Sequence, residues 1–176
     1  MKDKIISAYQ QIGKELQIRV EGTSMTPLIQ NKSIVFADIS AKMFPVSGEI
    51  CLFKNSEGYV VHRAIRIFGR RDGSGEIIEK GDASLNFTLR ESCDLVGIVT
   101  SVSNQGCNIR FDNPLNRYLN RTYGLYWKIV YMLNKIIINI TDGEQNRLQR
   151  FIINVFTRTV MAVFRTMTLL TIKESN

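Results

Sequence analysis

One serine stands in a short turn-forming segment, Gly22-Thr23-Ser24-Met25-Thr26-Pro27, between two stretches with the alternation of β-strands. A turn of this kind can hold a serine exposed at the edge of a rigid sheet. Because a serine hydroxyl is a weak nucleophile at neutral pH, it needs a base beside it to attack a carbonyl group. The sequence offers one histidine, His62, within the alternating, β-branched segment 59–65, which predicts a strand.

A carboxylate able to orient the imidazole follows the next strand-like segment. The run Glu79-Lys80-Gly81-Asp82 contains a glycine that permits a turn and ends in Asp82, 20 residues after His62. A carboxylate on the second ring nitrogen of a histidine fixes its tautomer and stabilises its charged form. We therefore expect Ser24, His62 and Asp82 to be the catalytic residues, with the alternative that Asp82 holds its own turn together.

In order and spacing, these segments resemble the signal peptidase I superfamily of serine endopeptidases, which also includes the self-cleaving phage-type repressors. The resemblance covers about residues 18–102. A histidine base in a Val-His-Arg context is typical of the branch found in the endoplasmic reticulum, in archaea and in spore formers, whereas other branches use lysine. The matching segments are Gly22-Thr23-Ser24-Met25-Thr26-Pro27, Gly48-Glu49-Ile50, Val61-His62-Arg63, Lys80-Gly81-Asp82 and Asp94-Leu95-Val96-Gly97-Ile98-Val99.

The resemblance implies an acyl-transfer reaction in which His62 removes the proton of Ser24 and Ser24 attacks a peptide carbonyl. It implies a signal or leader peptide as substrate, bound as an extended strand with small residues just before the scissile bond. The oxyanion is assigned to the Ser24 backbone amide, with help from the Thr23 hydroxyl. Arg63, which follows the base, is expected to have a structural role.

Two departures from the family pattern keep other functions open. Many members of the histidine branch have a second acid shortly after the Lys-Gly-Asp turn, where residues 83–88 contain none, and Glu91 and Asp94 are the remaining candidates. Some members also have a hydroxyl residue where this chain has Gly22. The alternatives are a catalytically inactive module that binds leader peptides and a self-cleaving regulator on the same fold. Histidine in place of lysine counts against the regulator.

Hydrophobic periodicity predicts the elements that position these residues. The expected fold is a mainly β catalytic domain at residues 16–113, with a signal-peptidase-like β fold. An amphipathic helix at residues 1–15 precedes it, and a basic amphipathic α-helical appendage at residues 114–176 follows it. Within the appendage a break at residues 141–143 separates a first helix from a second, at about 144–172. The predicted strands are 16–21, 33–39, 49–54, 58–68, 75–80, 95–103 and 107–111.

The composition is that of a globular protein, with 44% hydrophobic and 22% charged residues among 176. Of the net charge of +7, most lies in residues 114–176, which hold 9 Lys and Arg against 3 Asp and Glu. A basic amphipathic region favours a membrane surface or an export-machinery partner, and Arg158 and Arg165 argue against insertion of the apolar run 151–172. We expect a membrane-associated protein, with a cytoplasmic one as the alternative. Nucleic acid is not an expected partner, because no reader motif accompanies the basic residues.

Neither a cofactor nor a metal site is expected. Cys51, Cys93 and Cys107 are widely spaced and odd in number, which argues against a disulfide framework. A zinc site is not expected, because the chain has one histidine and its cysteines form no Cys-x-x-Cys pair. The segment 69–75 lacks the Lys-Ser/Thr that follows a phosphate-binding loop.

Overall fold

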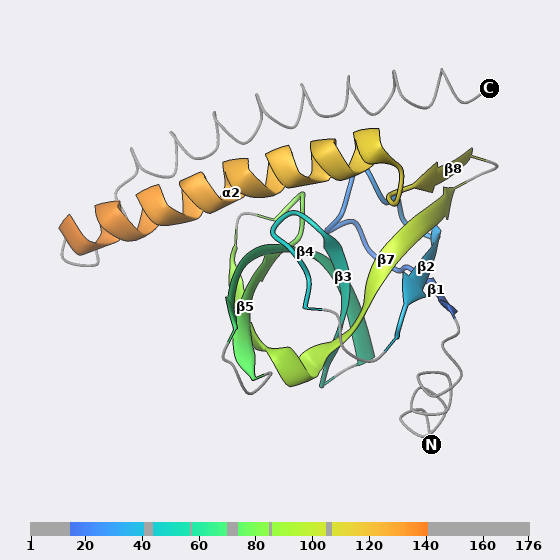
Figure 1. The fold of residues 1–176 in the computed structure, drawn as a ribbon, viewed down its shortest axis with the longest axis horizontal. Coiled ribbons are helices and arrows are strands. Elements are labelled where there is room, and N and C mark those ends of the chain that lie inside the picture. The colour runs from blue at the N-terminus through green and yellow to red at the C-terminus, as the bar shows by residue number, and fades with distance from the viewer. Residues whose placement is uncertain are drawn as a thin grey trace. The chain divides into compact units, whose positions relative to one another are not determined.

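A computed structural model of the chain describes residues 15–40, 44–56, 58–69, 74–84, 86–104 and 107–140. By its internal contacts the chain divides into two compact units, Met1–Leu125 and Tyr126–Asn176. The first unit contains all of the described sheet and the first part of the described helix (Figure 1). The predicted N-terminal helix, Glu15 apart, and the second predicted C-terminal helix at 144–172 lie outside the described residues. The predicted domain boundary at residue 113 stays a prediction.

Within the described residues, eight strands form one antiparallel sheet. Its strand order is β1-β2-β7-β3-β4-β5-β6, and β8 pairs with β7. The chain is therefore mainly antiparallel β with a helix after the sheet, as expected from the periodicity. The strands are β1 (Glu15–Arg19), β2 (Ile34–Asp38), β3 (Ile50–Asn55), β4 (Gly58–Gly69), β5 (Gly75–Lys80), β6 (Thr88–Glu91), β7 (Leu95–Asn104) and β8 (Cys107–Arg110), with a 3₁₀ helix η1 (Ser92–Asp94) between β6 and β7.

The seven predicted strands are present, with ends within two residues of the expected positions. The eighth, β6, was not predicted. It has four residues and lies at the edge of the sheet, and three of its side chains are exposed. A strand that is so short and so little buried produces no hydrophobic alternation from which sequence could identify it.

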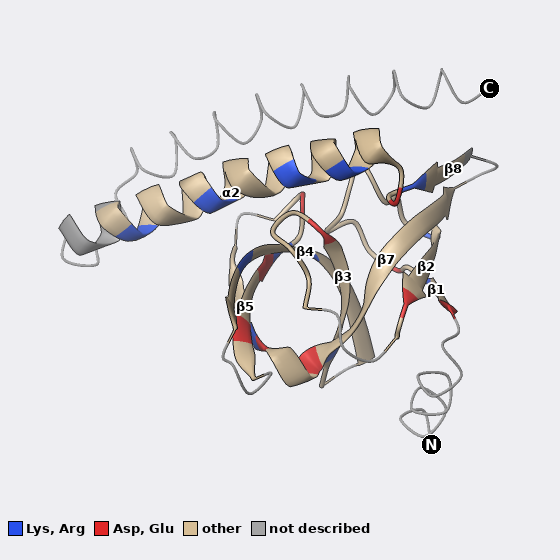
Figure 2. Cartoon of the chain, viewed as in Figure 1, with Lys and Arg blue, Asp and Glu red and all other residues tan. Residues whose placement is uncertain are grey.

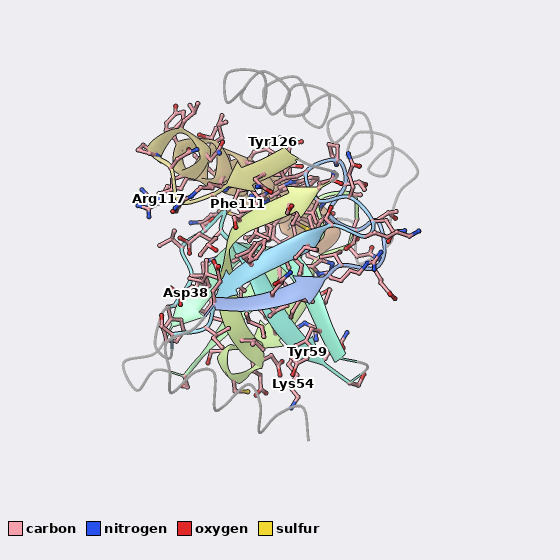
Figure 3. All side chains as sticks on the ribbon, turned by 90° about the vertical axis from the view of Figure 1, so that its right-hand side faces the viewer. Asp38, Lys54, Tyr59, Phe111, Arg117 and Tyr126 are labelled. Atoms are coloured by element: carbon pink, nitrogen blue, oxygen red, sulfur yellow. The ribbon has the colours of Figure 1, made fainter. Side chains whose placement is uncertain are left out.

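The middle of the sheet holds the core of the first unit. Residues two apart in a strand point to the same face, and the alternation of β3 and β4 accordingly brings apolar side chains together there. Lys54 and Tyr59 pair at the far end of the same β3 and β4 ladder (Figure 3). One buried cluster of this core consists of Cys51, Phe53, Ala64 and Ile77.

The register between β4 and β5 decides which polar side chains meet. Arg63 pairs with Lys80, and Ala64 pairs with Glu79. Because side chains alternate along a strand and paired residues share a face, Glu79 lies on the same face of the sheet as Ala64 and His62. Arg63 and Lys80 lie on the opposite face.

Helix α2 (Pro114–Ile140) follows the sheet. Asn113 caps its start, since the Asn113 Oδ1 accepts a hydrogen bond of 2.7 Å from the Asn116 backbone amide, and Pro114 occupies the first helical position, where no backbone donor is needed. The helix has four basic residues and no acidic one. Basic residues are blue in Figure 2. Among the described residues, no helix is both long enough and apolar enough to cross a bilayer.

Candidate active site

Ser24 lies in the turn that joins β1 to β2 and is exposed to solvent. The residues that follow it are anchored in the core, because the side chains of Met25, Leu28 and Ile29 are buried. The Ile29 amide donates a hydrogen bond of 2.9 Å to the Met25 carbonyl, which closes this turn. An exposed hydroxyl is thus held on a turn whose next side chain is fixed in the core.

The structure brings Ser24 and His62 together. The distance from His62 Nε2 to Ser24 Oγ is 3.2 Å, and the His62 side chain is only 16% exposed. The backbone at Gly81 lies against both residues, since a Cβ there would be 3.0 Å from His62 Nε2 and 3.0 Å from Ser24 Cβ. The Ala83 amide donates to the Ser24 carbonyl at 2.8 Å. The loop after β5 therefore closes one side of this pair and requires glycine at position 81.

A buried carboxylate holds the other side of the imidazole. His62 Nδ1 is hydrogen-bonded to Glu79 Oε2, and the Glu79 side chain is completely buried. Arg90 Nε, on β6, donates to the second oxygen, Glu79 Oε1, at 3.2 Å. With Nδ1 donating to the carboxylate, Nε2 is left as the acceptor that faces the Ser24 hydroxyl.

Asp82 does not contact the imidazole, contrary to the expectation that it orients the ring. Its two carboxylate oxygens accept hydrogen bonds from Arg63 Nε and Nη2 at 2.8 and 2.7 Å. Both side chains are buried, so Asp82 is the structural partner of Arg63, in line with the alternative that it holds its own turn. The carboxylate on the imidazole is Glu79.

Sequence reasoning missed Glu79 and Arg90, and one signal was available for Glu79. An acid that directly follows the apolar pair Ile77 and Ile78 inside a predicted strand has to be buried or paired. Arg90 gave no signal, because β6 was not predicted. Of the two candidates for a second acid, Asp94 lies in η1, whereas the Glu91 carboxylate accepts a hydrogen bond from Cys93 Sγ at 3.4 Å.

The backbone near the serine explains the departure at Gly22. This residue has φ of +108°, a conformation that side-chain-bearing residues rarely adopt, and its amide donates to Asn31 Oδ1 at 3.2 Å. A hydroxyl residue at position 22 would therefore be strained. Among the described residues, neither the Ser24 amide nor the Thr23 hydroxyl donates to a protein acceptor, and their role as oxyanion donors stays a prediction.

Cys51 is the cross-strand neighbour of His62 but is not a second nucleophile. It is completely buried, and burial raises the pKa of its thiol, which keeps the sulfur protonated and unreactive. In the part of the chain that the structure describes, no group of three or more His, Cys, Asp and Glu side chains is arranged to hold a metal ion.

Lys80 lies in the core beside this site. Its side chain is 1% exposed, and its Nζ donates to the Gly81 carbonyl at 2.9 Å and to the Asp82 carbonyl at 3.5 Å. Burial lowers the pKa of Lys80 to about 7, against the opposing effect of the Asp82 carboxylate and with a further contribution from the Arg63 charge.

No protein-family model matches the chain, and no curated protein shows significant similarity to it. The chemistry of the site is therefore inferred from its residues and distances. An exposed hydroxyl, an imidazole within hydrogen-bonding distance and a buried carboxylate behind the ring are the parts that acyl transfer to a serine requires.

We expect Asp82→Asn to lower the free energy of unfolding by about 3–5 kcal/mol, because it leaves the buried Arg63 charge without its counter-ion. Urea unfolding followed by circular dichroism measures the change. Asp112→Asn is the matched control: it breaks the exposed pair that Asp112 makes with Arg110, which should change the free energy of unfolding little. Equal effects of the two substitutions would contradict the structural role of Asp82.

We expect Lys80 to make the protein more stable as the pH rises from about 7 toward 10. The pKa of Lys80 is lowered to about 7 in the folded protein, so in this window the folded chain has lost a proton that the unfolded chain still binds. The free energy of unfolding therefore rises with pH, by up to about 1.4 kcal/mol per pH unit. Thermal unfolding of the wild type and of Lys80→Met across this range is the measurement. A slope that persists unchanged in Lys80→Met would assign the effect to another group.

Proposed function

We propose that this chain is a serine-type endopeptidase of the signal peptidase I type, in the branch with a histidine base, and that it cleaves signal or leader peptides. The observation that carries the proposal is the 3.2 Å distance from Ser24 Oγ to His62 Nε2, with Glu79 hydrogen-bonded to Nδ1. The serine segment, the Val-His-Arg strand and the Lys-Gly-Asp turn support the choice of substrate class.

The reaction runs through an acyl-enzyme. His62 Nε2 accepts the proton of Ser24 as Oγ attacks the carbonyl carbon of the scissile bond, and the Glu79 carboxylate stabilises the imidazolium. The Ser24 amide and the Thr23 hydroxyl donate to the oxyanion. The tetrahedral intermediate collapses as His62 returns the proton to the leaving amine. Water then loses a proton to His62, attacks the ester and releases the new carboxyl terminus and Ser24.

The Glu79 carboxylate bears on the choice between an enzyme and an inactive leader-peptide-binding module. The lack of an acid after the Lys-Gly-Asp turn and the presence of Gly22 are the two features that keep the module open as an alternative. Glu79 lies before that turn and occupies the position of an orienting carboxylate on His62. A complete serine, histidine and carboxylate arrangement supports the enzyme over the module.

A location at a membrane surface is part of the proposal. On α2, Leu125, Ile129, Met132 and Ile136 are between 45% and 56% exposed. The same helix carries only basic charges. Apolar side chains beside basic ones are the features of a helix that lies on an anionic bilayer. An export-machinery partner or a cytoplasmic location is the alternative.

We expect a serine-reactive acylating probe to add one adduct to the wild type, at Ser24. Ser24→Ala and His62→Ala should abolish labelling, because they remove the nucleophile and its base. Glu79→Gln should slow it by about 10²- to 10⁴-fold, since a neutral partner no longer fixes the imidazole tautomer. Intact-mass spectrometry follows the adduct, with circular dichroism to verify folding.

Asn108→Ala, a change at an exposed residue of β8, is the control and should be labelled at the wild-type rate. An adduct that persists in Ser24→Ala would contradict the mechanism. Labelling of Glu79→Gln at the wild-type rate would show that the Glu79 carboxylate has no part in the mechanism.

We expect Ile129→Asp to weaken binding to vesicles that contain about 30% anionic lipid, because it places a charge among the exposed apolar side chains of α2. Co-sedimentation with vesicles measures binding. Gln17→Asp changes the net charge equally at an exposed position of β1 and should affect binding less. Equal losses in the two variants would indicate that net charge alone governs the association.

A further inference from the structure

The buried face of β4 connects the candidate active site to helix α2. Arg63 follows His62 and is completely buried. Toward the site, its Nε and Nη2 donate to the Asp82 carboxylate at 2.8 and 2.7 Å. Toward the helix, its Nη1 donates to Asn120 Oδ1 at 2.8 Å, and its Cζ lies 4.7 Å from the centroid of the Tyr123 ring. Arg63 thus joins the loop after β5 to the first part of α2.

The first part of α2 is fixed against the sheet by a backbone contact between glycines. A Cβ on Gly124 would lie 2.3 Å from the Gly48 Cα, and a Cβ on Gly48 would lie 2.1 Å from the Asn120 carbonyl oxygen. Arg63 Nη1 also donates to the Gly48 carbonyl at 2.7 Å. With the backbones in contact, Asn120 cannot shift without moving the turn before β3.

The loop after β5 transmits this constraint to the reacting atoms. Asp82, held by Arg63, is flanked by two residues that touch the site. Gly81 lies against His62 Nε2, which a Cβ would approach to 3.0 Å, and the Ala83 amide donates to the Ser24 carbonyl at 2.8 Å. A displacement of Asp82 therefore displaces the backbone that contacts both members of the pair.

We propose that Asn120 and Tyr123 are positioning residues for Ser24 and His62, acting through Arg63 and Asp82, and that the first part of α2 belongs to the catalytic apparatus. The kinetic part of this inference rests on the proposed function. The coupling of the helix to His62 is a statement about geometry and holds for an inactive protein as well.

The test uses the single histidine of the chain. In protein labelled with ¹³C- and ¹⁵N-histidine, the imidazole signals report on His62 alone. Asn120→Leu removes the acceptor of Arg63 Nη1, and Tyr123→Leu removes the aromatic face. Asn120→Asp keeps an oxygen acceptor. Tyr118→Leu is the matched control, because Tyr118 lies on the same helix and is 67% exposed.

We expect Asn120→Leu and Tyr123→Leu to shift the His62 imidazole signals and the midpoint of their pH titration. The rate constant for acylation of Ser24, measured with the same probe on the full chain, should fall by about 10- to 100-fold, since a displacement of about 1 Å can cost on the order of 10²-fold in rate. Asn120→Asp should restore both values toward the wild type, and Tyr118→Leu should leave both unchanged.

Circular dichroism on the same samples separates these effects from unfolding. If Asn120→Leu fails to fold, Tyr123→Leu and Asn120→Asp decide the question. Imidazole signals that match the wild type in every folded variant would overturn the inference, even where acylation is slower. No acylation of wild-type Ser24 would reject the proposed function, while the His62 signals would still decide whether α2 is coupled to the site.

Discussion

A completely buried guanidinium is the constraint on which the rest of the structure depends. Removing the Arg63 charge from water costs several kcal/mol unless it is paired and its donors are used. The chain meets this cost with the Asp82 carboxylate, two further oxygen acceptors and the face of Tyr123. These partners come from three segments: the turn before β3, the loop after β5 and helix α2. A guanidinium has a fixed fork of donors, so the segments that satisfy it are held in one arrangement.

The alternation of side chains along β4 places Arg63 and His62 on different faces of the sheet. His62 and Arg63 are consecutive and therefore face opposite sides of the sheet. The register with β5 then assigns Glu79 to the side of His62 and Lys80 to the side of Arg63. One side thus carries the His62 imidazole, which faces the Ser24 hydroxyl, and the buried Glu79 carboxylate, and the other side carries the buried ion pair that holds the adjoining loop. A slip of one residue in this register would move Glu79 to the side of Arg63.

The same register explains how much could be predicted from the sequence. Alternation within a strand is a local property, so the strands, Ser24 in its turn and His62 on β4 could be predicted. The partner of the imidazole depends on how β4 aligns with β5, which no local pattern specifies. For this reason the sequence predicts Asp82, after a turn glycine, and gives no place to Glu79. The contact between Gly48 and Gly124 depends on tertiary structure in the same way. Helix α2, predicted as an appendage, accepts a hydrogen bond from the buried Arg63 through Asn120.

Lys80 is buried beside the Arg63 and Asp82 ion pair. Both carboxylate oxygens of Asp82 accept hydrogen bonds from Arg63, and the ammonium of Lys80 donates to the backbone carbonyls of Gly81 and Asp82. Carbonyl dipoles compensate a buried charge less than a carboxylate does, which is consistent with a lowered pKa of about 7. An ionisation near pH 7 in a serine hydrolase is ordinarily assigned to a histidine base. Lys80, whose pKa is lowered to about 7, is hydrogen-bonded to the backbone that contacts Ser24. A pH profile of the proposed activity would therefore identify His62 as the base only if it were also measured in Lys80→Met.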